Sequence, residues 1–462
     1  MEDLKFSHYY LSLIIFLVFI LKIESISYNN TLEIVAQFNI IEFRINSTHT
    51  KKCEKCMPAG IKLSKNGTIF CSFPRWYDDV IVTFAKYNKK ENVFEPWPSI
   101  EMNQRYLSGN SSGLNSILGF EIDKDDNLYI LDQGRIKKNP ALNNSMKLLN
   151  YSLKDGKLKR EYIFNSDIVD SSNSFLNDIV IDQKNKLAYI SDSGNSISEK
   201  VTDYKPGIIV LKLEDDKQYK ILTNHHSVFP DQSFWLHIEK EPVINNTTPM
   251  MTGVDGIALS CDREVLYYCP LSGRMLYSVF TKDIHKAIEE NQLNNITVYE
   301  GFKKEASDGL LASSKGYLYM TGIETGSIYV SNSIEQDLLR FNYKDFESFQ
   351  GNKTTMWPDT LAIHDGYLYF VSNQLNNFPH NIDYENPKNG KYNFAILKFS
   401  VDNDDSYIKG CSGFGNDFGI SSIIIWICFA VIILIVLSFV LMGSNNQEEV
   451  IDKHMNLGIK ED

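Results

Sequence analysis

The sequence repeats one hairpin pattern six times, and this repetition limits the folds open to the chain more than any other feature. Each copy has a short apolar strand, a polar turn, a second strand of aliphatic and aromatic residues, and a break rich in Gly, Ser or Asp. The copies begin near Ala59, Leu118, Asn177, Val254, Ser307 and Pro358. Their turns contain pairs such as Asn-Gly, Lys-Gly and Asp-Gly, which suit tight hairpins.

A third apolar strand follows each hairpin, and the spacing between copies leaves room for a fourth. These third strands are expected at Val80–Tyr87, Lys147–Leu153, Gly207–Leu213, Met275–Phe280, Ser327–Ser331 and Asn393–Ser400. Six such sheets around one axis form a β-propeller, which leaves only short, protected edges. An irregular β-sandwich would not need six copies of one pattern. The sequence therefore predicts an all-β, six-bladed propeller over residues 26–410, with one short helix near Lys282–Asn291.

The apolar segment Leu32–Phe38 has no partner in the first repeat. We expect it to pair with the last repeat and so to join the two ends of the ring.

Six of the seven cysteines lie between the two long apolar runs of the chain, and Cys428 lies inside the second run. An even number of cysteines in an oxidising compartment predicts disulfides. Cys411 is expected to bond to one of the three cysteines nearest the N-terminus. Cys53-x-x-Cys56 also fits a zinc or redox site, but no second such pair or His pair accompanies it. The disulfide candidates are Cys53, Cys56, Cys71, Cys261, Cys269 and Cys411.

The two apolar runs predict how the chain is targeted. Leu11–Ile23 has the length and position of the core of a signal peptide, so residues 1–25 are expected to be removed, with an uncleaved anchor as the alternative. Residues 420–442 carry no charge and are long enough to cross a bilayer as a transmembrane helix. The sequence thus predicts a single-pass type I protein of the plasma membrane or an endomembrane. Its linker is 411–419 and its cytoplasmic tail is 443–462.

The net charge and the glycosylation sequons agree with a folded domain that lies outside the cytosol. The formal net charge is −12 and no basic cluster is present, so nucleic acid is not an expected partner. Sequons for N-glycosylation are absent from 443–462. They occur at Asn29, Asn46, Asn66, Asn110, Asn143, Asn150, Asn245, Asn246, Asn295 and Asn352.

Several segments together resemble the yellow / major royal jelly protein family. The most specific is Ile69–Tyr87, which contains Pro-Arg-Trp and is followed by Pro-Trp-Pro-Ser. Further matches, in order, are Leu128-YILDQG, Leu187-AYISDSG, His226-SVFPDQ, Asp255-GIALS and Trp357-PDTLAI. The resemblance runs from about Leu32 to about Asn376. It implies a six-bladed, secreted propeller linked to pigment chemistry, to binding of small aromatic amines or to nutrition.

The sequence departs from that family in two places. Gly113–Asp126 lacks the cysteines that flank the second repeat in insect members, and a C-terminal membrane helix is not usual. These departures leave the expected fold unchanged. They weaken the inference that this chain binds the same ligand as other family members.

The best candidates for a ligand site stand where each innermost strand begins. Such positions meet at one mouth of a propeller channel, where converging carboxylates repel one another unless they hold a cation or stay hydrated. Calcium takes six to eight oxygen ligands, so Ca²⁺ bound by Asn177, Asp255 and Asp308 is one interpretation. Capping of local turns is the other. The full set is Asn177, Asp178, Asp255, Asp308 and Asp359.

Two further groups of residues are weaker candidates. Arg75 and Trp76 suit an aromatic or anionic ligand, or alternatively an Arg stacked on a Trp between blades. An isomerase reaction on an oxidised catechol, which the resemblance raises, would need a general base near the channel. The histidines to consider are His225, His226, His237 and His364. No catalytic residue can be named from the sequence.

Three functions remain open. The first is a membrane-tethered propeller that binds a small molecule, such as an aromatic amine or catechol, or a partner protein at its channel. The second is an enzyme of the same fold, either a dopachrome-type isomerase or a calcium-dependent lactonase or esterase. The first repeat lacks the Glu that such hydrolases use, since Pro58–Gly60 stands there. The third is an adhesion or receptor ectodomain that binds an extracellular protein.

Overall fold

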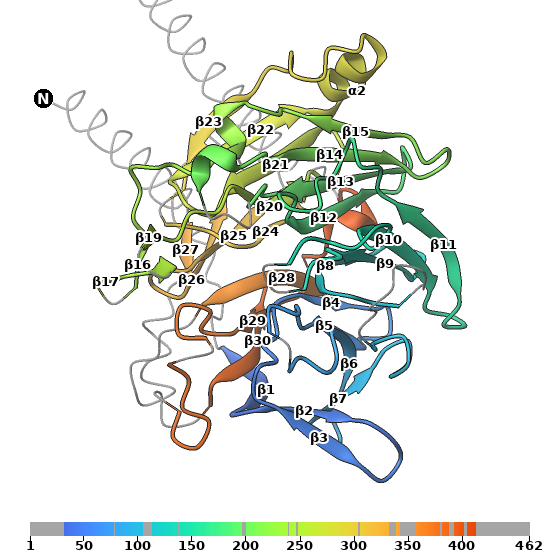
Figure 1. The fold of residues 1–462 in the computed structure, drawn as a ribbon, viewed down its shortest axis with the longest axis vertical. Coiled ribbons are helices and arrows are strands. Elements are labelled where there is room, and N and C mark those ends of the chain that lie inside the picture. The colour runs from blue at the N-terminus through green and yellow to red at the C-terminus, as the bar shows by residue number, and fades with distance from the viewer. Residues whose placement is uncertain are drawn as a thin grey trace, which may run out of the picture. The chain divides into compact units, whose positions relative to one another are not determined.

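In the computed structural model, six β-sheets are arranged around a central axis as a six-bladed propeller (Figure 1). The structure describes residues 32–412 except for 78, 105–112, 137–138, 196–199, 239, 246–247, 304, 332–338, 342–356, 379–380, 388–391 and 402–403. The six-bladed propeller predicted from the repeats is confirmed.

Each blade has four antiparallel strands, with the first strand of each sequence repeat nearest the axis. Blade 1 contains β4 (Ile61–Leu63), β5 (Ile69–Ser72), β6 (Phe84–Asn88) and β7 (Val93–Pro96). Blade 2 contains β8 (Ile117–Ile122), β9 (Asn127–Asp132), β10 (Lys147–Ser152) and β11 (Leu158–Ile163). Blade 3 contains β12 (Leu176–Asp182), β13 (Leu187–Asp192), β14 (Gly207–Lys212) and β15 (Gln218–Ile221).

The remaining blades follow the same order. Blade 4 contains β20 (Val254–Leu259), β21 (Val265–Pro270), β22 (Met275–Phe280) and β23 (Tyr299–Phe302). Blade 5 contains β24 (Leu310–Ala312), β25 (Leu318–Gly322), β26 (Ser327–Ser331) and β27 (Leu339–Phe341). Blade 6 contains β28 (Pro358–His364), β29 (Tyr367–Ser372), β30 (Phe394–Ser400) and β1 (Glu33–Phe38).

Additional strands and short helices lie outside the four-stranded blades. β2 (Ile41–Arg44) and β3 (Thr50–Cys53) extend blade 1 at its outer edge, where Phe43 of β2 pairs in parallel with Phe94 of β7. Two small hairpins precede blade 4, β16 (His237–Ile238) with β17 (Glu241–Pro242), and β18 (Ile244–Asn245) with β19 (Thr248–Pro249). The expected short helix is present as α2 (Thr281–Glu289). Short 3-10 helices occur at Val201–Asp203, His226–Val228 and Tyr407–Lys409.

The first strand closes the ring, as the unpartnered segment Leu32–Phe38 predicted. β1 pairs antiparallel with β30, in a register that runs from Glu33 opposite Lys398 to Phe38 opposite Phe394. Blade 6 is therefore built from both ends of the propeller sequence, and the other five blades are held between these ends.

Apolar side chains fill the spaces between neighbouring blades. Between blades 1 and 2, the ring of Phe84 packs edge-on against Phe120, and Trp97 packs edge-on against Tyr151. Aromatic pairs in this geometry add about 0.5–1.5 kcal/mol to the burial of their surface. The many aromatic residues of the sequence thus serve mainly as packing between blades.

The cysteines do not pair as the sequence suggested. Cys53 bonds to its near neighbour Cys56, and Cys261 bonds to Cys411 across 150 residues. Cys71 and Cys269 are buried free thiols, so their inclusion among the disulfide candidates was wrong. The expected bond from Cys411 to the N-terminal cysteines was also wrong, because the chain after β30 crosses beneath the ring and ends at blade 4.

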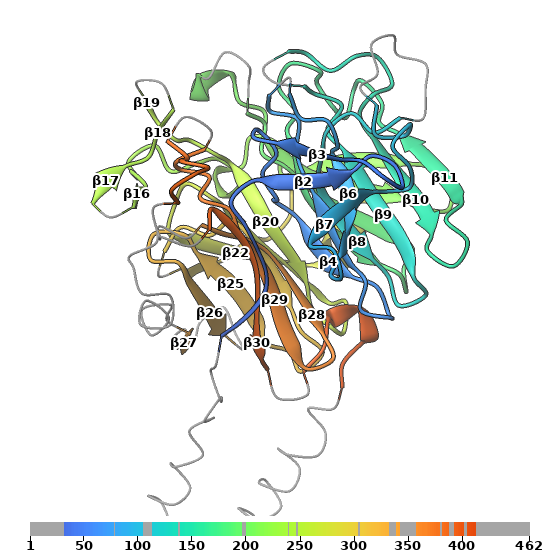
Figure 2. The same ribbon diagram turned by 90° about the horizontal axis from the view of Figure 1, so that it is seen from below.

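That crossing segment, Asp404–Cys411, contacts the ends of the inner strands of blades 2 to 5 and so covers one mouth of the central channel. It is the orange-red turn in Figure 2. Asp404 accepts hydrogen bonds from the hydroxyls of Ser314 and Tyr319 in blade 5. The hydroxyl of Tyr407 accepts a hydrogen bond from the backbone N–H of Ile181 in blade 3, at 3.0 Å. We call Asp404–Cys411 the plug, and we call the mouth that it occupies the lower mouth.

Arg263 of blade 4 fastens the plug further. Its guanidinium donates hydrogen bonds to the carbonyls of Tyr407 and Ile408 and lies over the ring of Tyr407. The disulfide between Cys261 and Cys411 lies at the same end of blade 4. The plug is thus held by hydrogen bonds, a cation–π contact and a covalent bond.

The predicted targeting segments cannot be compared with the structure. The signal peptide 1–25, the transmembrane segment 420–442 and the tail 443–462 lie outside the described residues. Among the residues that are described, no helix has the length and apolar character needed to span a membrane.

The fold separates predicted glycosylation sites that are accessible from one that lies within a sheet. Asn46, Asn66, Asn143 and Asn295 are exposed and lie outside strands, whereas Asn150 lies within β10 between β9 and β11 with its amide oxygen buried. We expect glycans on the first four and none on Asn150, because a glycan there would separate strands of blade 2. Peptide mapping after enzymatic deglycosylation in isotopically heavy water will measure this. An occupied Asn150 in folded protein would contradict the sheet register.

Candidate functional site

The candidate site is built on an irregularity that recurs in four innermost strands. In β8, β12, β20 and β28, the pairing with the second strand shifts by one residue near the strand start. In β12, for example, Leu176 lies opposite Asp192, but Ile179 lies opposite Ile190, so one extra residue is accommodated on β12. A β-bulge of this kind bends the strand and redirects side chains. The bulged positions include Asn177, Asp178, Asp255 and Asp359.

Glycines at the same positions let neighbouring inner strands approach closely. A Cβ on Gly119 would lie 2.4 Å from the carbonyl oxygen of Asn177, and one on Gly309 would lie 2.3 Å from that of Asp359. No side chain fits at either distance. Each glycine therefore brings the backbone of one blade against the site residue of the next, and the carboxylates converge as a result.

The predicted residues do come together at the mouth opposite the plug, which we call the upper mouth. Asn177, Asp255, Asp308 and Asp359 line a cavity of about 90 Å³, together with Trp76 and the apolar side chains of Leu118, Phe175, Met250, Leu271 and Leu375. Asp178 lines a smaller recess deeper in the channel, with the same three aspartates. Five acidic or amide side chains from four blades thus share one site.

Burial changes the charge of this cluster. It is the main cause that raises the pKa of Asp178 to about 7 and that of Asp308 to about 6. Burial, followed by the charge of Asp308, also holds the pKa values of Asp255 and Asp359 well above their usual range. Carboxyls this close do not all ionise together, so the cluster retains protons near neutral pH.

Neighbouring groups fix the orientation of these carboxyls. Asp308 accepts a hydrogen bond from the indole N–H of the buried Trp357 and is hydrogen-bonded to Asp255. Asp359 accepts a hydrogen bond from the Asn373 amide at 2.7 Å. The site is therefore preorganised rather than formed by exposed, mobile side chains.

Hydroxyls on the second strands hold the backbone of the site residues in place, and the sequence did not indicate these hydroxyls. Ser191 accepts a hydrogen bond from the backbone N–H of Asp178 and donates to the carbonyl of Asp255. Thr321 accepts from the N–H groups of both Asp308 and Gly309. Their signal in the sequence is a Ser or Thr in the second strand of the hairpin, but such residues are common in strands.

Arg75 and Trp76 have different roles although they are adjacent. Trp76 lines the upper cavity. Arg75 is 1% exposed, and its guanidinium donates to the backbone carbonyls of Val80, Leu114 and Asn115. Arg75 therefore ties blade 1 to the segment that leads into blade 2 and does not line the cavity.

The four histidines considered as general bases lie elsewhere. His225 is hydrogen-bonded to Ser227, His226 contacts Glu300, and His237 is exposed on β16. His364 ends β28 and lines a pocket at the lower mouth. In the part of the chain that the structure describes, the lining of the upper cavity contains no histidine. The residues there with a pKa suited to proton transfer near neutrality are Asp178 and Asp308.

The described residues contain no group of three or more His, Cys, Asp or Glu side chains placed to hold a metal ion. Of the predicted calcium ligands, Asn177 donates its amide N–H to Ser193, and Asp255 and Asp308 are hydrogen-bonded to each other. Calcium binding by Asn177, Asp255 and Asp308 stays a prediction.

The raised pKa values predict that the buried carboxyls lower the free energy of unfolding at neutral pH. Well below pH 3.8 both carboxyls are protonated whether the chain is folded or not, so no cost arises. The cost grows as the pH rises above 3.8, where the unfolded chain ionises, and is complete above about 6 to 7, where the folded carboxyls ionise as well. We expect Asp178→Asn with Asp308→Asn to raise the free energy of unfolding at pH 7.5 by at least about 1.4 kcal/mol, the equivalent of one pKa unit. Denaturant titrations at pH 7.5 and pH 4 will test this. A gain equal at both pH values would contradict it.

Comparisons with known proteins agree with this architecture. The family model described as major royal jelly protein matches residues 115–407. Major royal jelly protein 3 of Apis mellifera is 24% identical over 361 residues, which are 75% of this chain and 55% of that protein. The chain thus spans about half of the length of that relative. Dopaminechrome tautomerase of Drosophila melanogaster is 20% identical over 426 residues, which are 84% of this chain and 87% of that protein.

Solved structures offer a weaker likeness. A luciferin-regenerating enzyme is 12% identical with a TM-score of 0.45, and covers 80% of this chain and 95% of its own. A gluconolactonase from Xanthomonas campestris is 10% identical with a TM-score of 0.44, and covers 80% and 89%. The family match extends over more than half of the sequence, and the chain belongs to the major royal jelly protein family.

Proposed function

We propose that the chain is a membrane-tethered protein of the secretory pathway that binds a small aromatic amine or catecholamine at the upper mouth of its propeller. The observation that carries the proposal is the cluster of buried carboxyls from four blades, which lines a cavity with aromatic and aliphatic walls.

The chemistry of the cavity suits an organic cation. Carboxylates in a site of low polarity attract an ammonium group strongly, and the ring of Trp76 offers a face for a cation or an aromatic ring. A mostly apolar pocket with a few converging polar groups is the usual form of a small-molecule site. An ammonium group would occupy the carboxyl end of the cavity, with the aromatic part toward Trp76 and Phe175.

The proposed location is based on other features. The family match and two disulfides fit the secretory pathway. Tethering is proposed from the uncharged run 420–442 of the sequence.

An isomerase is the second function that a specific observation favours. Asp178, with a pKa of about 7, can accept or donate a proton at neutral pH, as general acid–base catalysis requires. One relative is named dopaminechrome tautomerase. A calcium-dependent hydrolase and a protein-binding ectodomain have no comparable support.

Calorimetric titration of dopamine into the full-length protein in lipid nanodiscs will test the proposal. We expect binding that weakens at least tenfold, or about 1.4 kcal/mol, in Asp255→Asn/Asp308→Asn. Affinity should fall between pH 7.5 and pH 5, because the carboxyls take up protons over this range. Near pH 6.5, binding should release protons, which titrations in buffers of different ionisation enthalpy will detect.

Two controls make this outcome specific. Asp215→Asn changes an exposed carboxylate in the turn before β15 and should leave dopamine affinity unchanged. 4-Methylcatechol has the same ring without the amine and should bind much more weakly. Equal affinity for both compounds, or an unaffected double variant, would contradict the proposal. Conversion of dopaminechrome by the unmodified protein but not by Asp178→Asn would instead favour the isomerase.

Tethering predicts a simple fractionation result. The full-length protein, expressed in cultured insect cells, should stay in the membrane pellet after alkaline carbonate washing. A chain that stops at Gly419 should appear in the medium, because it lacks the uncharged run. A full-length chain that is released by carbonate would contradict the membrane anchor.

A further inference from the structure

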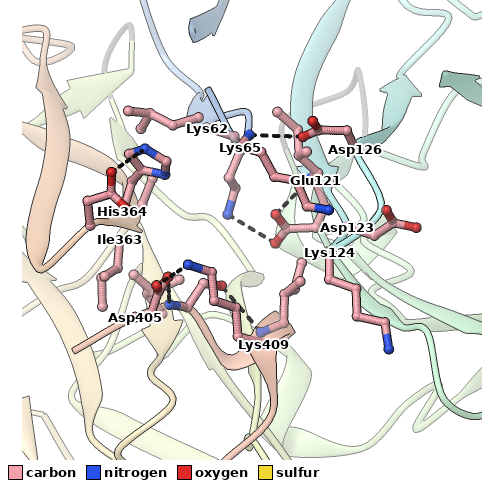
Figure 3. A pocket seen from close by; sticks show the side chains of 17 residues that line it. Lys62, Lys65, Glu121, Asp123, Lys124, Asp126, Ile363, His364, Asp405 and Lys409 are labelled. Carbon is pink, nitrogen blue, oxygen red and sulfur yellow. Dashed lines mark hydrogen bonds and ion pairs between the residues drawn. The ribbon is translucent and has the colours of Figure 1, made fainter. Parts of the chain in front are cut away.

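A second and larger pocket lies at the lower mouth, beside the plug (Figure 3). Its volume is about 400 Å³, and its walls come from the ends of β4, β8 and β28, from β24 and from the plug. The upper cavity is lined by the starts of the same inner strands. The two pockets have different linings, although Gly119 of the upper recess and Glu121 of the lower pocket are only two residues apart on β8.

Lys62 is the deepest cation in this pocket. It is 7% exposed, and its ammonium group lies in the middle of the view in Figure 3, directed at Glu121. Within the described residues, that group makes one hydrogen bond, to Glu121 Oε2 at 3.2 Å. An ammonium group has three N–H donors, and buried donors are normally satisfied. Two donors of Lys62 are thus left for an acceptor in the pocket.

Carboxylates face the same space. Glu121 lies beside Lys62, and Asp405 of the plug pairs with Lys409 at the opposite wall. The pocket therefore presents groups of both charges, so neither a simple anion nor a simple cation would match all of them. A ligand that carries both a positive and a negative charge would match them.

Apolar side chains complete the lining. Leu311, Ile363 and Ile408 come from blade 5, blade 6 and the plug. They offer a surface for an uncharged side chain, since burial of apolar area favours binding.

We propose that the lower pocket binds a zwitterion of the α-amino-acid type with an apolar side chain. Its carboxylate takes the two remaining donors of Lys62. Its ammonium group lies against Glu121 and Asp405, and its side chain packs on Leu311, Ile363 and Ile408. Its lining shares no residue with the amine site proposed at the upper mouth.

The first test varies the ligand on unmodified, full-length protein in nanodiscs. Saturation-transfer NMR and calorimetry should show binding of L-leucine. N-acetyl-leucine lacks the cationic group, leucinamide lacks the carboxylate and glycine lacks the side chain, so each should bind at least tenfold more weakly. If leucine does not bind, or if one of these analogues binds as well as leucine, the proposal is overturned.

The second test varies the protein. Lys62→Met should abolish leucine binding and Lys62→Arg should retain part of it, because Arg keeps the charge and the donors. Asp405→Asn should weaken the binding of leucine but not that of N-acetyl-leucine. Because Asp405 lies near the surface, this variant can replace Lys62→Met if the latter does not fold. Asp255→Asn/Asp308→Asn should leave leucine binding unchanged. Loss of leucine in that double variant would place it at the upper mouth and overturn the proposal.

Discussion

The antiparallel pairing of β1 with β30 is the interaction on which the rest of the structure depends. A propeller blade contacts only its two neighbours, so the ring has free edges until its last blade is complete. Glu33–Phe38 supplies the missing outer strand of blade 6, and the ends of the propeller sequence are then held in one sheet. With the ring closed, the starts of the inner strands are fixed around the axis, and the site residues are brought into contact.

The ligand site proposed at the upper mouth is built at the expense of stability. Bulges and close glycines force carboxyls from four blades together, and burial raises their pKa values. The Ser191 hydroxyl then accepts a hydrogen bond from the backbone N–H of the bulged Asp178, and the Thr321 hydroxyl accepts one from that of Asp308. Such strain is typical of functional sites, where local structure is held in place by the surrounding fold.

The sequence predicted much of this because the fold is repetitive. Six hairpins implied six blades, and an Asp or Asn at four of the inner-strand starts implied that these side chains meet, as Asp255 and Asp308 do. Contacts that occur only once were not predictable. The bond between Cys261 and Cys411 depends on a segment crossing beneath the ring, and neither cysteine has a local pattern that indicates its partner. Arg75 looked like a ligand residue because its backbone acceptors, such as Leu114, have no signature in the sequence.

The covalent bond at Cys411 also determines how the propeller would respond to a mechanical load. A pull on the chain beyond this residue passes through the disulfide to Cys261 in blade 4. The hydrogen bonds between β1 and β30, which close the ring, lie outside that path. The most vulnerable seam of the ring is therefore shielded from tension applied at the C-terminal end, and the load is borne by a blade whose four strands are consecutive in sequence.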